Sequence, residues 1–437
     1  MKSSYYNIVA SITGGKVLYN TMYKNIVELS LDEYKLLLKM ERSGFAVSSE
    51  EESKLLKFLT EQMFIVDDNL DELEYFKLEW NRSLYSSGVL NHTILPNLAC
   101  NLDCPYCFES KTGRFMSRED EENYLAWLEP QLVGTKYLYL SWFGGEPLLS
   151  KNTIERITEG ILRMEKQYGF EYAANIVTNG VLLDKKFTQR VETLRIKSVQ
   201  VTLDGDRDIH DSYRFAKKSG AGTFDTILEN MTGFCRDDAS DAVLSIRVNV
   251  TDENYGSLPA LFERIPTVIK DKSVLMFRWV YSHSNGRNPG KEFSEKMKGE
   301  SPITNLIPLY QLAEEMGFTT NSFDEELTYN FCECDFDKAF LIDQDGDLFM
   351  CSHSMEKEES VGNVSSGFSS QRNFSRYARF VNTTPFEDEE CLECKILPLC
   401  KGGCRKARYL GTKVCSDVRW DIPGYILQKH QKAQLFL

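Results

Sequence analysis

The chain has 437 residues, of which 42% are hydrophobic and 27% charged, a balance typical of a globular protein with a large core. Its formal net charge of −14 argues against nucleic-acid binding, which needs clustered basic residues. No apolar run reaches membrane-spanning length, and the first residues lack the layout of a signal peptide. We therefore expect a cytoplasmic protein that does not bind a membrane.

Residues 1–85 are expected to form a separate small unit. Three short apolar stretches between residues 7 and 30 have the length of strands and are divided by turns. Two helices should follow, the first capped by Ser30 and the second beginning near Ser49. The apolar stretch at 63–66 offers a further edge strand. The predicted order is three strands, two helices and an edge strand.

From about residue 91 the pattern changes to strands that alternate with segments of helical length. The strand candidates are HTILPNL, KYLYLSW, AANIVTN, SVQVTLD, VLSIRVNV and VLMFRWVY. This alternation predicts six βα units over 86–285, forming a parallel α/β sheet or an open barrel. Ligands in such folds bind at the C-terminal ends of the strands. Residues 286–330 are expected to be a helical connector.

The chain has twelve cysteines and five histidines, and the cysteines are clustered. Because the chain is long and lacks a secretion signal, we interpret the clusters as metal sites rather than disulfides. Cys100, Cys104 and Cys107 directly follow a predicted strand. Three thiolates can hold three irons of a 4Fe–4S cluster and leave the fourth iron open. The alternative is a zinc site, which would need a fourth ligand; the nearby His92 lies on the predicted strand.

The CxxxCxxC spacing, with the aromatic Tyr106 before its last cysteine, resembles the signature of radical S-adenosylmethionine (SAM) enzymes. Strand-end motifs follow in the order that this superfamily shows: Gly144-Gly145-Glu146-Pro147, Thr178-Asn179-Gly180 and Thr202-Leu203-Asp204-Gly205. The resemblance implies a partial (β/α)6 radical SAM barrel. It also implies that the open iron binds SAM and that reduction releases methionine and a 5′-deoxyadenosyl radical.

The same resemblance implies a set of SAM contacts, in which Tyr106 belongs to the signature itself. The backbone of Gly144 and Gly145 and the carboxylate of Glu146 would bind the SAM amino group. Thr202 would contact the ribose, and Arg214 would bind the carboxylate. Leu275 is a candidate for an apolar contact to the adenine.

The last hundred residues, 331–437, contain a second group of cysteines. The spacing of these cysteines along the chain resembles the seven-cysteine signature of SPASM domains. These are loop-rich iron–sulfur domains of peptide- and protein-modifying radical SAM enzymes. The resemblance implies two auxiliary 4Fe–4S clusters, and hence three clusters in the chain. The ligands would be Cys332, Cys334, Cys351 and Cys404 for auxiliary cluster I, and Cys391, Cys394, Cys400 and Cys415 for auxiliary cluster II.

Three features of this chain have competing interpretations. Cys332 is the expected fourth ligand of auxiliary cluster I, but it could be a buried thiol, with one iron left open for a substrate thiolate. Cys235 has no neighbouring cysteine and is expected to pack in a helix. The segment FLIDQDGDLFM weakly resembles a calcium loop, but it lacks the closing Glu, so a hairpin is the better interpretation.

The N-terminal unit is winged-helix-like, and in front of a radical SAM–SPASM core it resembles the peptide-recognition unit of ribosomal peptide maturases. The resemblance implies binding of a leader peptide along a strand edge; the alternative is a cap that only stabilises the barrel. We therefore expect an enzyme that abstracts hydrogen from a ribosomally made precursor peptide and forms a thioether or carbon–carbon crosslink. A flavodoxin- or ferredoxin-type protein would supply the electron.

Two other functions compete with this expectation. Anaerobic sulfatase-maturing enzymes share both regions, but they lack an N-terminal unit of this length and carry an acidic base where this chain has Ser352. A non-catalytic scaffold or electron carrier is the second alternative. The intact cysteines and the Gly-Gly-Glu-Pro segment argue against it.

Overall fold

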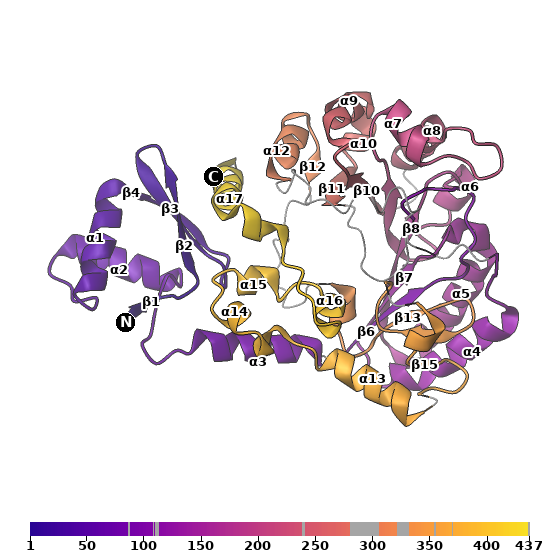
Figure 1. The fold of residues 1–437 in the computed structure, drawn as a ribbon, viewed down its shortest axis with the longest axis horizontal. Helices are drawn as coiled ribbons and strands as arrows, with labels where there is room; N and C mark the ends of the chain where they lie inside the picture. Colours follow the sequence, from indigo (N-terminus) through magenta and orange to yellow (C-terminus); the bar gives the residue numbers. More distant parts are fainter. Residues whose placement is uncertain are drawn as a thin grey trace. The chain divides into compact units, whose positions relative to one another are not determined.

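The computed structural model describes residues 1–85, 88–107, 109, 113–237, 241–279, 306–320, 332–353, 355–368 and 370–435. These residues fold into two compact units, one made of residues 1–85, 323–335 and 381–437 and the other of residues 86–322 and 336–380 (Figure 1). The cysteine-rich segment is shared between the two units. None of the helices described combines the length and apolarity that a membrane crossing needs.

The larger unit is built on a parallel sheet, which confirms the predicted α/β fold. Its central strands are neighbours in chain order and all pair in parallel. They are β6 Val89–Ile94, β7 Tyr137–Trp142, β8 Glu171–Thr178, β9 Ile196–Thr202, β10 Val243–Val250 and β11 Ser273–Trp279. Strand β12 (Thr319–Thr320) extends the sheet beside β11. The sequence predicted all six strands because each apolar run is followed by a segment of helical length.

Beyond β6 the sheet continues into a hairpin. Strand β13 (Ala339–Ile342) pairs in parallel with β6, and β14 (Asp347–Phe349) returns antiparallel, followed by β15 (Gly362–Asn363). The turn is closed by Gly346, whose φ of 73° places it in the left-handed region. Asp343 accepts hydrogen bonds from the backbone nitrogens of Asp345 and Asp347, each at 2.9 Å. The hairpin interpretation of FLIDQDGDLFM is confirmed.

Helices cover one face of this sheet (Figure 1). They are α4 Arg118–Leu128, α5 Lys151–Tyr168, α6 Lys185–Thr188, α7 Arg207–Tyr213, α8 Phe224–Arg236, α9 Leu258–Arg264, α10 Thr267–Lys270, α12 Ile307–Glu315 and α13 Gln371–Val381. On β6, His92 packs against Trp127 and lies 3.1 Å from the hydroxyl of Tyr124, so it belongs to the helix-side core. Helix α12 falls within the expected connector; the connector residues 286–305 and 321–330 lie outside the described ranges.

The smaller unit contains the predicted N-terminal strands and helices. Strands β2 (Asn7–Ile12), β3 (Gly15–Asn20) and β4 (Ile26–Ser30) form an antiparallel sheet. Helix α1 (Leu31–Arg42) has a capping box formed by Ser30 and Glu33, and Ser49 caps α2 (Glu50–Glu61). The apolar stretch at 63–66 contributes β5 (Ile65–Val66), which pairs with β1 (Lys2–Ser3) and does not extend the three-stranded sheet.

The C-terminal part of the chain packs on this N-terminal sheet. Leu18 and Leu29 on one face of the sheet join the core formed with α1 and α2. On the other face, Tyr19 meets Tyr425 of the C-terminal helix edge-to-face, at 5.8 Å between ring centroids. In this smaller unit the further helices are α3 Glu72–Leu84, α14 Glu389–Leu392, α15 Leu397–Cys400, α16 Arg405–Tyr409 and α17 Ile422–Leu435. Both faces of the three-stranded sheet are therefore covered.

Candidate functional site

Cys100, Cys104 and Cys107 lie on the loop after β6, at the C-terminal end of the parallel sheet. The side-chain nitrogen of Asn179 lies 3.8 Å from the Cys100 sulfur and donates to Asn101 Oδ1 at 2.7 Å. Within the described ranges, no group of three or more His, Cys, Asp or Glu side chains is placed to hold one metal ion. Three cysteine thiols on one strand-end loop are the donor type that iron–sulfur clusters take.

Gly144 and Gly145 bring the next strand end against the entrance of this loop. A Cβ atom on Gly144 would lie 2.4 Å from the backbone oxygen of Asn97, and one on Gly145 would lie 2.2 Å from that of Ala99. The nitrogen of Glu146 donates to the same Ala99 oxygen at 2.8 Å. Both glycines are thus required by a backbone-to-backbone approach, a reason that the motif alone did not reveal.

Glu146 joins the ends of β7 and β8. Its carboxylate is fully buried and accepts hydrogen bonds from Leu148 N, Thr178 Oγ1 and Asn179 N, at 2.8 to 2.9 Å. Burial raises the pKa of this carboxyl, and these donors oppose the shift. Since a carboxylate has about four lone-pair positions, three are already used within the protein. The structure therefore places Glu146 as a link between strand ends, beside its expected role toward the SAM ammonium.

Tyr106 connects the cysteine loop to the end of β9. Its hydroxyl donates to Asp204 and accepts from the Arg214 guanidinium at 2.7 Å, while Arg214 lies 3.7 Å from Asp204. Burial raises the pKa of Asp204, and Arg214 opposes the shift. Thr202, also buried, ends the same strand. The structure thus brings together two of the residues expected to contact SAM, Tyr106 and Arg214, and Thr202 lies two residues before Asp204.

His210 supports the positions of Asp204 and Arg214 through hydrogen bonds, a role that the sequence did not predict. Its Nδ1 accepts from the nitrogen of Asp204 at 3.3 Å, and its Nε2 lies 3.3 Å from Thr223 Oγ1. Thr223 in turn donates to the backbone oxygen of Arg214 at 2.6 Å. Burial lowers the pKa of His210 well below its usual range, so the ring is neutral. The ring therefore ties the backbone of Asp204 to that of Arg214.

Leu275 does not support the expected adenine contact. It is fully buried on β11 and shares a strand face with Phe277, since alternate residues point the same way. Phe277 packs against Phe262 of α9 and Tyr310 of α12. Leu275 therefore faces the helix layer, and this expectation is corrected. The alternation of side chains along β11 would have excluded this contact if the sequence had shown which strand face meets the helices.

In the smaller unit, the cysteines expected to bind auxiliary cluster II lie close together. The nitrogen of Cys394 donates to the Cys391 oxygen at 3.1 Å, and the nitrogen of Ser416, next to Cys415, donates to the Cys400 sulfur at 3.5 Å. Burial raises the pKa of the Cys400 thiol, and the neighbouring thiols add to the shift. Two arginines lie beside these sulfurs. Arg408 lies 3.6 Å from the Cys391 sulfur, and Arg419 lies 3.0 Å from the Cys415 sulfur. Four thiols with cationic neighbours fit an anionic thiolate-ligated cluster.

Cys334 and Cys404 are each followed by one member of a buried ion pair. Asp335 Oδ1 lies 3.0 Å from Arg405 Nε, and both side chains are at most 3% exposed. The other oxygen of Asp335 accepts from the backbone nitrogen of Cys332 at 3.1 Å. The pair therefore links the segments that carry Cys332, Cys334 and Cys404. Sequence reasoning missed it, although each member directly follows a cysteine.

Of the remaining cysteines, Cys351 follows β14 in the larger unit and is buried. Cys235 is buried on α8, and burial raises the pKa of its thiol to about 11, as befits a packing residue.

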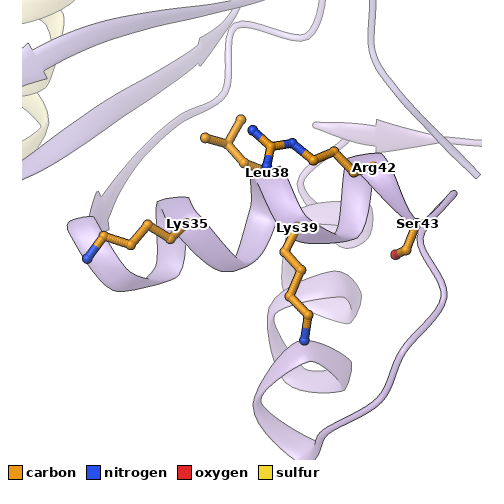
Figure 2. Close-up of a pocket in the computed structure, with 5 residues that line it drawn as sticks. All are labelled: Lys35, Leu38, Lys39, Arg42 and Ser43. Carbon is orange, nitrogen blue, oxygen red and sulfur yellow. The ribbon is translucent and has the colours of Figure 1, made fainter.

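A surface hollow over α1 is lined by Lys35, Leu38, Lys39, Arg42 and Ser43 (Figure 2). Two of its cations are compensated, Lys35 by Asp32 and Lys39 by Glu52.

Comparison with known proteins gives a consistent result. Residues 94–265 match the model of the Radical SAM superfamily. The chain is 20% identical to the radical SAM cyclopropyl synthase TigE of Paramaledivibacter caminithermalis, over 92% of this chain and 89% of that protein. It is 23% identical to a cysteine-type anaerobic sulfatase-maturating enzyme of Clostridium novyi, over 70% and 85%. Its fold resembles native anSMEcpe with bound AdoMet and the Kp18Cys peptide, with a TM-score of 0.57, 19% identity and coverage of 79% and 98%.

Proposed function

Since the chain contains a radical SAM domain and is an enzyme of that superfamily, we propose that it modifies a ribosomally synthesised precursor peptide in the cytoplasm. The observation that carries this proposal is the composition of the smaller unit. One unit contains both a three-stranded sheet, in which each outer strand pairs with one other described strand, and seven of the C-terminal cysteines. Such a unit joins a means of binding an extended peptide to thiolates that can hold auxiliary clusters.

The larger unit would generate the radical. Cys100, Cys104 and Cys107 would hold a 4Fe–4S cluster, which together with SAM supplies a 5′-deoxyadenosyl radical. Arg214, held by Tyr106 and Asp204, offers its guanidinium to the SAM carboxylate. Thr202 offers its hydroxyl to the ribose.

The SAM ammonium would bind beside the Gly144-Gly145 backbone, near the buried carboxylate of Glu146. The contacts of both glycines with the loop that enters the cysteine motif support this position. They hold the strand end that carries Glu146 against that loop.

The C-terminal cysteines would hold two further clusters. Cys391, Cys394, Cys400 and Cys415 would bind auxiliary cluster II, which the backbone bond between Cys394 and Cys391 and the bond from Ser416 to the Cys400 sulfur support. The link between Asp335 and Arg405 supports a common role for Cys332, Cys334 and Cys404 in auxiliary cluster I, and by resemblance Cys351 would complete that set. These clusters would accept the electron released when the product forms. A flavodoxin- or ferredoxin-type protein would supply the electron for SAM cleavage.

The N-terminal sheet would bind the leader part of the peptide by adding a strand. Its two faces are covered by α1 and α2 on one side and α17 on the other. Among the described strands, β2 and β4 each pair on one side alone. An extended peptide would add a strand at one of these two edges. After hydrogen abstraction from the core peptide, the product would be a thioether or a carbon–carbon crosslink.

The second candidate is maturation of a sulfatase, in which a Cys or Ser of the substrate becomes formylglycine. The similarity to the Clostridium novyi protein favours it. Two features of this chain oppose it: the N-terminal unit and Ser352, which stands where the resemblance places an acidic base. The products distinguish the candidates by their chemistry, because an aldehyde reacts with a hydrazide or hydroxylamine probe and a crosslink does not.

The proposal is tested by anaerobic reconstitution of the full chain, reduction, and measurement of 5′-deoxyadenosine formed from SAM. The expected result is SAM-dependent product that disappears in the Cys100→Ala variant. A Cys235→Ala variant is the matched control, since that thiol packs in a helix, and it should retain the activity. Absence of 5′-deoxyadenosine from iron-loaded wild-type protein would contradict the proposed catalysis.

A further inference from the structure

We propose that the N-terminal unit positions auxiliary cluster II, and that Tyr5 and Thr21 are the positioning residues. This inference rests on the proposed function, because it takes Cys391 and Cys394 as ligands of that cluster. It goes further by giving the N-terminal unit a role toward a cluster, beside its proposed role toward a peptide.

Two side chains of the N-terminal unit bind the backbone on either side of Cys394. The hydroxyl of Tyr5 donates to the backbone oxygen of Glu393 at 2.6 Å. The hydroxyl of Thr21 donates to the backbone oxygen of Lys395. Because the two acceptors directly precede and follow Cys394, these bonds restrict where its thiol can lie.

The same segment also binds back to the N-terminal unit. The ammonium of Lys395 donates to the backbone oxygen of Asn7 at 3.2 Å and lies 5.6 Å from the centre of the Tyr5 ring, within the range of a cation–π contact. Asn7 begins β2, and Thr21 directly follows β3. The loop that carries Cys394 is therefore held at the ends of two neighbouring strands.

Apolar packing joins a second proposed ligand, Cys391, to the N-terminal unit. Cys391 and Leu397 belong to one buried cluster with side chains from α3 and from the turns that precede β2 and follow β3: Tyr6, Met22, Phe76 and Trp80. Phe386, just before α14, packs edge-to-face on Trp80 at 5.7 Å between centroids. Cys391 is thus seated in a core to which residues 1–85 contribute the larger side chains.

The segment has its own restraint at one end. Asp388 caps α14 by accepting from the backbone nitrogen of Cys391 at 3.3 Å, and Lys413 and Arg408 lie 2.9 and 3.2 Å from it. Hydrogen bonding to Lys413 lowers the pKa of Asp388, so it stays ionised. This cap restrains Cys391, whereas the carbonyls that flank Cys394 bind Tyr5 and Thr21. The backbone nitrogen of Cys394 also donates to the Cys391 oxygen at 3.1 Å. The position of Cys394 is therefore set by this local bond together with the bonds of its flanking carbonyls to Tyr5 and Thr21.

Hydrogen bonds, burial and ligand geometry set the reduction potential of an iron–sulfur cluster. Removing the two hydroxyls should change the potential and the spectrum of auxiliary cluster II without removing a ligand. A role limited to folding would instead change stability and leave the spectrum of the loaded cluster unchanged. The two roles can therefore be separated by experiment.

The test uses the full chain with the substitutions Tyr5→Phe and Thr21→Val, reconstituted anaerobically. Both are introduced in a Cys100→Ala, Cys104→Ala, Cys107→Ala background, so that the auxiliary clusters alone contribute the signal. The matched control removes the same two kinds of hydroxyl elsewhere in the unit, with Tyr75→Phe and Thr60→Val. Iron per chain, the electron paramagnetic resonance spectrum and the midpoint potential of each cluster are measured.

We expect a changed spectrum and a shifted potential for one auxiliary cluster in the test variant, and wild-type values in the control. Wild-type spectra and potentials in both variants would overturn the proposal. If the double variant does not fold, Tyr5→Phe alone decides by the same measurements, since its hydroxyl is at the surface.

A Cys391→Ala, Cys394→Ala variant separates this proposal from the function on which it rests. Loss of one auxiliary signal in that variant confirms that these cysteines bind a cluster. If no signal is lost, the cluster assignment itself is wrong. If the signal is lost but Tyr5 and Thr21 have no effect on it, the assignment stands and the positioning role is wrong.

Discussion

Arg405 Nε lies 3.0 Å from Asp335 Oδ1, and this buried pair joins the residue after Cys404 to the residue after Cys334. A buried pair is sensitive to loss of one partner, since the remaining charge is left without compensation, at a cost of about 3–5 kcal/mol. Both members of the pair are therefore needed for stability, and each lies next to a proposed cluster ligand.

We predict that Asp335→Asn will lower the melting temperature and reduce the iron bound per chain by up to one cluster. The amide cannot compensate the Arg405 guanidinium, and the segments that carry Cys334 and Cys404 should separate. Iron analysis and calorimetry of the anaerobically reconstituted protein measure both effects. Asp32→Asn, which breaks an exposed pair with Lys35, is the control and should change neither. Equal iron and equal melting temperatures in both variants would contradict this role of the pair.

Tyr106→Phe should weaken SAM binding about tenfold, because the lost hydroxyl bonds link two charged groups. Without that hydroxyl, Arg214 can move toward Asp204 and away from the SAM carboxylate. The iron content should not change, since no thiolate is removed. Tyr168→Phe removes a similar hydroxyl that donates to Glu129 at 2.9 Å from the end of α5, and its SAM affinity should equal the wild type. Equilibrium binding of SAM decides, and undiminished affinity in Tyr106→Phe would count against the link.

Gly145→Ala should disrupt the loop of Cys100, Cys104 and Cys107. The new methyl group would lie 2.2 Å from the Ala99 backbone oxygen, so the backbone must move, at a cost of about 1–3 kcal/mol or more. We expect less iron in the radical SAM cluster and a lower melting temperature. Gly233→Ala is the control: a Cβ at that position would have no neighbouring atom within 4 Å outside its own helix backbone, and alanine in that helix should stabilise by about 0.5–1 kcal/mol. Equal iron and stability in the two variants would refute the close approach.

Asp343 predicts a pH dependence of stability. Burial, together with the charges of Asp347 and Asp345, raises its pKa from 3.8 to about 7. An acid whose folded-state pKa is raised stabilises the fold most below its unfolded pKa, and this contribution is lost as the pH rises through about 7. Asp343→Asn keeps the acceptor for the turn amides and removes the charge. The melting temperature of the variant, relative to that of the wild type, should therefore rise between about pH 6 and about pH 8.5. A constant difference over this interval would show that the group does not titrate there.

Local signals in the sequence account for most of the fold. Caps at Ser30 and Ser49 mark helix starts correctly because they act within one turn of the chain. The six parallel strands follow from alternation with helical segments. The strand-end motifs lie where expected, because the C-terminal ends of parallel strands share one edge of the sheet.

What the sequence did not predict depends on contacts between distant segments. The packing of Tyr425 on Tyr19, and of Phe386 on Trp80, joins the C-terminal region to residues 1–85. Neither pair has a local pattern that marks it, because complementarity of buried side chains is a property of the assembled core. For the same reason the helix-side orientation of Leu275 was not recognised from its apolar character.

The radical is proposed to act on a peptide, and the intact mass of that peptide is the most direct test of this role. A candidate precursor, identified as a small open reading frame beside the gene, is incubated anaerobically with reconstituted, reduced enzyme and SAM. A crosslink predicts the loss of two hydrogen atoms, seen with the wild-type chain and absent with Cys100→Ala. An unchanged precursor, together with an aldehyde formed on a Cys or Ser of a sulfatase-derived peptide, would contradict the account.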